Sequence, residues 1–196
     1  MKKEWLFNII LSVIIFLIIV SAIAIGVMFY YINTINNFTE MRNLANKYEA
    51  DIQVELQMRF DKVPNLVEIV QSAAKHEEEI IKSITEAREQ YNAAVTSGDT
   101  AKMLEANTAI NAACTKFAEE YPEIAAMELY GDLMDEYSGI EAAIAVARRN
   151  YNEVVMKYNN MIEHMPSAII AQKGGFERIS EFKAVEAANN AFEINM

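Results

Sequence analysis

The first part of the chain carries an uninterrupted apolar segment. From Leu6 to Ile32 no residue is charged. As an α-helix this segment spans about 40 Å, against about 30 Å for the hydrocarbon core of a bilayer. Aromatic residues, which favour membrane–water interfaces, stand at its two ends: Trp5 at one, and Phe29, Tyr30 and Tyr31 at the other. The pattern predicts a transmembrane anchor over residues 5–32, after a short polar N-terminus of residues 1–4.

A cleaved signal peptide is the alternative for this segment. Lys2 and Lys3 make a basic start, and Ala22-Ile23-Ala24 fits a cleavage site. However, the apolar run continues well beyond that site, which favours an uncleaved, single-pass anchor. The lysines and the terminal amine before the segment outweigh Arg42 and Lys47 after it, so we expect the rest of the chain outside the cytoplasm.

Beyond the anchor, apolar residues recur every three or four positions with charges between them, as in amphipathic helices. Pro64, Thr96-Ser97-Gly98-Asp99, Pro122 and Pro166 mark the breaks, and Asp99 or Thr100 is expected to cap a helix. The pattern predicts helices at about 34–61, 64–96, 100–120 and 123–164. Since no turn signal separates Ile32 from Met41, the anchor is able to continue directly into the first of them.

Four amphipathic helices with short connections bury their apolar faces best by antiparallel packing. We therefore expect an all-α chain: the N-terminal transmembrane helix, then an antiparallel up-and-down four-helix bundle with coiled-coil-like packing over residues 33–165. Residues 166–196 are expected to form an irregular C-terminal tail with room for one short helix.

Charge and cysteine content narrow the classes of partner. The formal net charge is -11, so the surface repels phosphate backbones and nucleic acid is not an expected partner. The single cysteine, Cys114, excludes an intramolecular disulfide, and its small-residue surroundings favour a buried structural role. Expected partners are the lipid bilayer, other membrane or envelope proteins, and copies of the chain itself.

Motifs for catalysis and metal binding do not appear in the sequence. His76 is followed four residues later by Ile80 instead of a second His, and the residues three before His76 and His164 are Ala73 and Met161 instead of Glu. Zinc-protease and di-iron patterns therefore fail. There is no Gly-rich phosphate loop either. We expect no catalytic, cofactor-binding or metal-binding residues, no cofactor, and no enzymatic activity.

Two polar groups stand out as candidate interaction or structural motifs. Arg59, Asp61 and Asn65 surround Pro64, where we expect them to cap and orient the helix start, with a binding role as the alternative. The second group lies in the last predicted helix and comprises Glu141, Arg148, Arg149, Asn152 and Glu153. Its two arginines and two glutamates are expected to form charge pairs within the helix, with one Arg facing the bundle as the alternative. His76, within Lys75–Glu79, is expected on a solvated helix face.

Two blocks of residues resemble the LemA family. The first runs from Glu55 to Glu68, followed by Lys75-His76-Glu77 and Thr85–Arg88; the second includes Tyr121-Pro122, Asp135-Glu136, Gly139, Glu141, Ala145–Glu153, Tyr158-Asn159 and Met165-Pro166. Departures from the family pattern stand at Ile140, Ala142, Ala143 and Met165. The resemblance implies a bacterial protein with an N-terminal membrane helix and a helical bundle, and it supplies no activity. Descriptions of the family place the short N-terminus outside the cell, against the charge balance above.

The sequence thus favours a non-enzymatic, membrane-anchored scaffold or assembly module of the bacterial envelope. The alternative is an extracytoplasmic sensor or small-ligand-binding bundle that acts through a partner protein.

Overall fold

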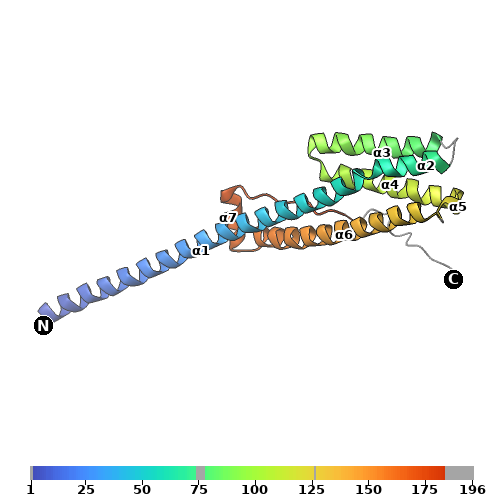
Figure 1. Ribbon diagram of the computed structural model, residues 1–196. Helices are drawn as coiled ribbons and strands as arrows, with labels where there is room; N and C mark the ends of the chain where they lie inside the picture. Colours follow the sequence, from blue (N-terminus) through green and yellow to red (C-terminus); the bar gives the residue numbers. More distant parts are fainter. Residues whose placement is uncertain (1, 74–77, 126, 184–196) are drawn as a thin grey trace. The chain divides into compact units, whose positions relative to one another are not determined.

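The computed structural model describes residues 2–73, 78–125 and 127–183, and every regular element in them is an α-helix. The helices are α1 (Lys2–Phe60), α2 (Val63–Ala73), α3 (Glu78–Ser97), α4 (Thr100–Glu120), α5 (Pro122–Ala125), α6 (Glu128–Glu163) and α7 (Ser167–Gly174), as Figure 1 shows. The expected all-α class is confirmed.

The chain forms two compact units. The first comprises Met1–Asn43 with Val155–Ile179, and the second comprises Leu44–Val154 with Ser180–Met196. The long helices α1 and α6 therefore contribute residues to both units. Because α1 is one helix, the predicted anchor and the first predicted bundle helix are a single element.

In the first unit, the apolar part of α1 is fully exposed. Its most apolar 18-residue window has a mean hydropathy of 3.1 and no buried residue, so by length and composition this helix is able to cross a membrane. A small core follows along the same helix. Phe38 packs edge-on against Tyr158 of α6, with ring centroids 6.3 Å apart, and tilted against Phe176, at 4.9 Å. Ile170 and Ala171 of α7 complete this core.

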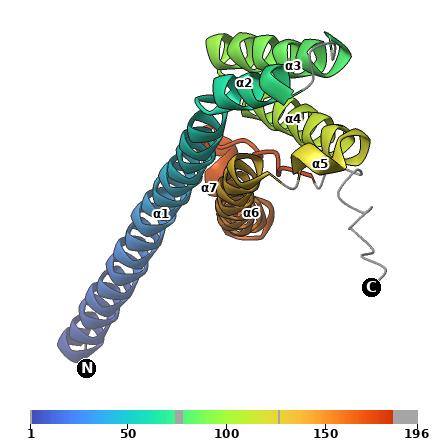
Figure 2. The same cartoon turned by 45° about the vertical axis from the view of Figure 1, so that its right-hand side comes forward.

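The second unit is a helical bundle. Figures 1 and 2 show α3 lying beside both α2 and α4, with α3 and α4 running in opposite directions. One ring of α1, Phe60, stacks on Tyr91 of α3 with centroids 3.9 Å apart. Many buried apolar side chains follow the predicted spacing of three or four residues, among them Ile52, Leu56, Leu66, Ile80, Ile84, Ile110, Phe117 and Ile144.

The break between α1 and α2 lies at Asp61 and Lys62. The Lys62 N–H donates to the Arg59 carbonyl and the Asn65 N–H to the Lys62 carbonyl, which closes tight turns on both sides of the break. Pro64 takes the second position of α2, where its missing N–H costs no helical hydrogen bond. The local structure therefore matches the prediction that one helix ends and the next begins near Pro64.

The single helix predicted over 64–96 is replaced by two helices, α2 and α3, which pack against each other. The sequence offers a reason. Five consecutive polar residues, Lys75–Glu79, interrupt the apolar stripe between Val70 and Ile80, so no continuous apolar face joins the two parts. Residues 74–77, His76 among them, lie outside the described residues.

The helix predicted at 123–164 likewise begins as the short α5 and continues as α6 from Glu128, with Ala126 outside the described residues. The expected cap of α4 is confirmed, since the Asp99 Oδ1 accepts the Lys102 N–H at 3.1 Å. The tail contains α7, which ends at Gly175 in the left-handed conformation.

Two glycines of the second unit provide a matched test of this backbone. Gly98 has a φ of +69° between α3 and α4, whereas Gly139 lies inside α6 with no atom within 4 Å of an added Cβ. Gly98→Ala is expected to lower the free energy of unfolding by about 1 kcal/mol, because alanine disfavours positive φ. Gly139→Ala is expected to raise it by up to about 1 kcal/mol. Denaturant unfolding of the full chain in detergent, followed by circular dichroism, measures the free energy of unfolding of both variants. A change of the same sign in the two variants would contradict the backbone conformations described for Gly98 and Gly139.

Candidate functional site

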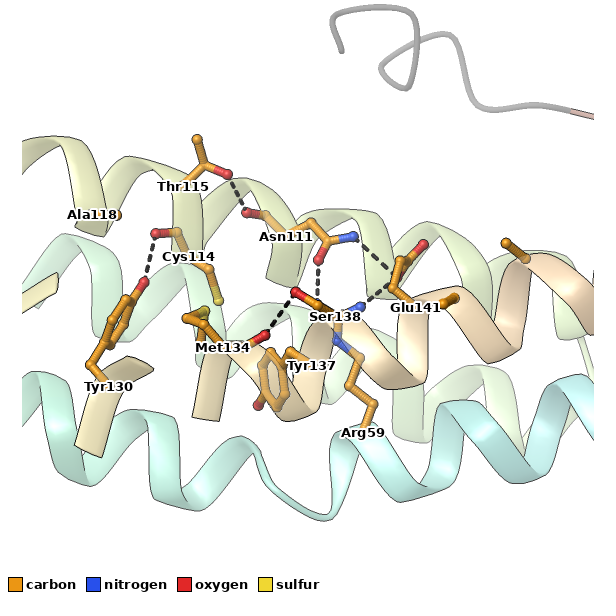
Figure 3. A pocket seen from close by; sticks show the side chains of 12 residues that line it. Arg59, Asn111, Cys114, Thr115, Ala118, Tyr130, Met134, Tyr137, Ser138 and Glu141 are labelled. Carbon is orange, nitrogen blue, oxygen red and sulfur yellow. Dashed lines mark hydrogen bonds and ion pairs between the residues drawn. The ribbon is translucent and has the colours of Figure 1, made fainter. Parts of the chain in front are cut away.

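A buried arginine joins three helices of the second unit. Arg59, in the last turn of α1, has only 2% of its side chain exposed. Its Nη1 lies 2.5 Å from the Glu141 Oε2 of α6, and its Nη2 donates to the Asn111 Oδ1 of α4. The guanidinium also stands 4.6 Å from the centre of the Tyr137 ring, at cation–π distance. Figure 3 shows Arg59 reaching from α1 toward these side chains.

Glu141 collects further donors from α4. The Asn107 Nδ2 donates to Glu141 Oε2 at 2.9 Å, and the Asn111 Nδ2 approaches the same oxygen at 3.4 Å. The carboxylate is 42% exposed, so water solvates part of its charge while the arginine relies on protein groups. A buried charge is tolerated only when it is paired and hydrogen-bonded, and this network provides both.

Three buried polar atoms of this network have no hydrogen-bond partner among the described residues: Arg59 Nε, Asn107 Oδ1 and Tyr137 Oη. Burial also raises the pKa of Tyr137 above that of an ordinary phenol. It raises the pKa of Tyr130 to about 12 and that of the Cys114 thiol to about 11. All three groups therefore stay protonated at neutral pH, and Cys114 is a poor nucleophile there.

A cavity of about 570 Å³ opens beside this network, between α4 and α6. Cys114, Tyr130 and Tyr137 form buried parts of its lining, while Ala142 and Ala145 are exposed at its edge. The remaining lining residues are Arg59, Asn111, Thr115, Ala118, Met134, Ser138 and Glu141 (Figure 3). The cavity thus combines small apolar side chains with one charged pair, which suits an extended peptide or a small amphipathic molecule better than a highly charged one.

An extended segment of the tail, residues 176–183, is the second notable feature, and we call it the strap. In the second unit, the Asn152 side chain binds the backbone of Phe182 twice: its Nδ2 donates to the Phe182 carbonyl at 2.7 Å, and its Oδ1 accepts the Phe182 N–H at 2.9 Å. The Tyr151 hydroxyl donates to the Ser180 carbonyl at 3.1 Å. The Arg148 Nη2 donates to the Lys183 carbonyl at 2.7 Å.

The first unit repeats this pattern. The Asn159 Nδ2 donates to the Ile179 carbonyl at 2.9 Å, and its Oδ1 accepts the Ile179 N–H at 3.0 Å. The Tyr158 hydroxyl donates to the Glu177 carbonyl at 2.9 Å. Each Tyr-Asn pair of α6 therefore binds the strap backbone in the same way. The two pairs are seven residues apart in the sequence, and the strap residues that they bind are three residues apart.

The structure brings some of the predicted motif residues together. The sequence predicted that Arg59 caps the start of α2, but its side chain does not do so. Its guanidinium is instead paired with Glu141 and Asn111 inside the bundle. Asp61 accepts from the Gln57 Nε2 at 2.6 Å, and the backbone of Asn65 takes part in the turn around Lys62.

For Glu141 and Arg148, the contacts in the structure differ from the predicted charge pairing within α6. Glu141 binds Arg59 of another helix, and Arg148 binds the strap. Asn152 joins Arg148 in holding the strap, whereas Arg149 is exposed. The expected interface aromatics, Trp5, Phe29, Tyr30 and Tyr31, are all exposed on α1.

Sequence reasoning missed Asn107 and Asn111 as partners of Glu141. A signal was present, since the two amides are four residues apart and lie among apolar residues of α4, where an unpaired amide would be costly. It missed the strap as well. The repeated Tyr151-Asn152 and Tyr158-Asn159 pairs, at a spacing of seven, were the available sign.

Comparison with protein families finds that the model of the LemA family matches residues 48–196. The match begins within α1 and includes the second unit from Tyr48 onward, with the cavity and the strap. No protein in a curated collection matches the chain.

Replacing Arg59 by Met is expected to lower the free energy of unfolding by about 2 to 3 kcal/mol, because Glu141 and Asn111 lose their main partner. The estimate lies at the low end for buried pairs, since water reaches Glu141. Lys62→Met is the matched control: it removes an exposed pair with Glu136, at 2.7 Å, and is expected to cost less than about 1 kcal/mol. Chemical unfolding of both variants in detergent measures the difference, and equal costs would argue against a structural role for Arg59.

Replacing Asn152 by Ala is expected to release the strap in the second unit. The Phe182 amide hydrogen should then exchange with solvent at least about tenfold faster, since it loses its acceptor. Asn150→Ala, on a neighbouring face of α6, is the control and should leave that rate unchanged. Hydrogen exchange read by mass spectrometry of strap peptides measures both, and unchanged exchange in Asn152→Ala would show that the strap is held by other contacts.

Proposed function

We propose that this chain, which belongs to the LemA family, is a single-pass membrane protein whose helical bundle serves as a non-enzymatic assembly module of the bacterial envelope. One observation carries the proposal. In the first unit, α1 passes from a fully exposed apolar segment ending at Ile32 to a fully buried Phe38 without a break. A fully buried aromatic side chain therefore lies about 9 Å, or less than two helical turns, beyond the apolar segment.

The exposed segment explains why a membrane is the expected environment. An apolar helix surface of this length is unfavourable in water, and its backbone groups are already paired within the helix. The exposed Trp5, Phe29, Tyr30 and Tyr31 stand at the two ends of the apolar segment, and aromatic side chains favour membrane–water interfaces. The charge balance around the segment supports a bundle outside the cytoplasm.

The interior of the bundle supports assembly over catalysis. The charged and amide groups of the Arg59 network bind one another, and the buried Cys114 and Tyr130 stay protonated at neutral pH. An acidic helical body attached to a membrane anchor suits contacts with other membrane or envelope proteins, or with copies of itself, and repels nucleic acid.

A second candidate function, a ligand-binding bundle that signals through a partner, is favoured by the cavity of about 570 Å³ between α4 and α6. Its volume falls in the range of small-molecule sites. Thermal stabilisation of the full chain by a small amphipathic compound, lost in Ala142→Trp, would support this candidate over a scaffold alone.

The anchor is tested by charge insertion. Leu17→Arg combined with Val20→Arg places two charges near the middle of the apolar segment, at a cost of roughly 2.5 to 3.5 kcal/mol each. The double variant is expected to leave the membrane fraction, whereas the matched Leu17→Ala, Val20→Ala variant should remain there after alkaline carbonate extraction. Identical fractionation of the two variants would contradict an anchor at residues 5–32.

The assembly role is tested by crosslinking in native membranes followed by affinity purification of the full chain. Defined protein partners or crosslinked copies of the chain are expected, and the Leu17→Arg, Val20→Arg variant serves as the control that should lose them. Recovery of only the monomer, from a chain that is properly in the membrane, would count against an assembly module.

A further inference from the structure

A groove of about 510 Å³ lies between α1 and α6 in the second unit, and we call it the α1/α6 groove. It shares only Ala142 with the cavity between α4 and α6, so it is a separate surface. The residues of α1 and then of α6 that line it are Asp51, Val54, Glu55, Ala142, Ala143, Val146, Ala147 and Asn150.

Both helices expose apolar side chains at this groove. Val54 of α1 is 57% exposed and Val146 of α6 is 51% exposed. Met58, four residues after Val54, is 48% exposed and extends the apolar edge of α1 by one turn. Single exposed apolar side chains are common on protein surfaces, but these border one groove. A partner that covers them removes apolar surface from water, which favours binding.

The groove suits a helix better than an extended peptide. Its lining along α6, from Ala142 to Asn150, is about 12 Å long, and apolar side chains seven residues apart on a docked helix span about 10 Å. The backbone groups of α1 and α6 are paired within their own helices, so an extended peptide would leave most of its N–H and C=O groups unpaired here. The small side chains of Ala142, Ala143 and Ala147 leave room for larger apolar side chains of a docked helix.

The α1 side of the groove is acidic. Asp51 and Glu55 are four residues apart, so they lie on one face of α1, about 6 Å apart along its axis. Neither carboxylate forms an ion pair with another described residue, and no basic side chain is among the residues that line the groove. Lys or Arg residues four apart on a docked helix match this spacing. The exposed Arg149, on α6 beyond Val146, favours a helix whose basic side faces α1.

A second copy of the chain is a poorer match for this groove. The chain has a formal net charge of -11, so two copies repel each other, and the two carboxylates add to that repulsion locally. The charge therefore favours a basic partner.

We propose that the α1/α6 groove docks an amphipathic helix of another membrane or envelope protein, with an apolar stripe in the groove and Lys or Arg residues against Asp51 and Glu55. This inference rests on the proposed assembly role and names the chemistry of the partner.

Binding is tested with a labelled synthetic peptide of about 18 residues, long enough to form a helix. It carries a Leu and Ala stripe at helical spacing and, on one flank, Lys residues four apart. The matched peptide has Glu in place of each Lys. Fluorescence anisotropy with the full chain in nonionic detergent is expected to give a Kd at least about tenfold lower for the Lys peptide.

A cation placed in the groove should block this binding. Val54→Arg is expected to raise the Kd of the Lys peptide at least about tenfold, because it removes an apolar contact and repels the Lys residues. Val95→Arg, on α3, is the matched control, since Val95 is also exposed, at 44%, and does not line the groove. It should leave the Kd unchanged.

The carboxylates are tested in the same assay. Asp51→Asn combined with Glu55→Gln is expected to raise the Kd about fivefold, since each surface pair contributes modestly, and to weaken its dependence on salt. Glu89→Gln combined with Glu105→Gln removes the same charge from exposed positions of α3 and α4 and should leave the Kd unchanged. Thermal melts confirm that each variant is folded.

The proposal is overturned if neither peptide binds, if the two peptides bind equally, or if Val54→Arg binds the Lys peptide as tightly as the unchanged chain does. In native membranes, a photo-crosslinking residue in place of Val146 is expected to join peptides with Lys or Arg residues four apart. Crosslinks to a second copy of the chain would overturn the proposal instead.

The groove and the assembly role fail in different ways. If Val54→Arg recovers the same partners from native membranes in the same amount, the groove is not their docking site and the assembly role stands. If the Lys peptide binds the groove but only the monomer is recovered from native membranes, the groove stands as a site for basic helices and the assembly role does not.

Discussion

The guanidinium of Arg59 sets a constraint on which the second unit depends. A charge with 2% of its side chain exposed has lost most of its hydration, so it is stable only where protein groups replace water. Glu141, Asn111 and the ring of Tyr137 do so, and they come from two helices other than its own. The end of α1 is therefore placed against α4 and α6 at one position along each helix.

Apolar packing alone would not impose that position. Side chains such as Ile110 and Ile144 gain nearly the same free energy from burial when a helix slides by one turn. A slide of α4 by one turn would leave only one of the two amides, Asn107 or Asn111, beside Glu141 and Arg59, and the other would lose its partner. The apolar stripes thus supply most of the stability, and the polar network selects one register, as buried polar groups do in some coiled coils.

Much of this fold follows from local sequence signals. The apolar run, the helical periodicity, the Gly98 turn and the Asp99 cap each act within a few residues, and each is found where the sequence indicates it. Periodicity alone does not reveal the separation of α2 from α3, because apolar residues at helical spacing stand on both sides of the polar run at Lys75–Glu79. The role of Arg59 is hidden for a different reason: its neighbours Asp61 and Pro64 form a strong local turn signal, whereas its partners Asn111 and Glu141 lie far away in sequence.

The strap could not be predicted from local sequence patterns, because it has no periodicity of its own. It becomes ordered through Tyr and Asn side chains of α6 that bind its carbonyl and N–H groups. An Asn side chain offers one donor and one acceptor, like a peptide unit, so it pairs with backbone as a neighbouring strand would. These hydrogen bonds use the backbone of the strap, whereas Phe176, Ile179 and Phe182 also pack through their side chains. The exposed positions between them are therefore free to vary in sequence over evolutionary time, and they are natural places to introduce tags or foreign epitopes without disturbing the helices beneath.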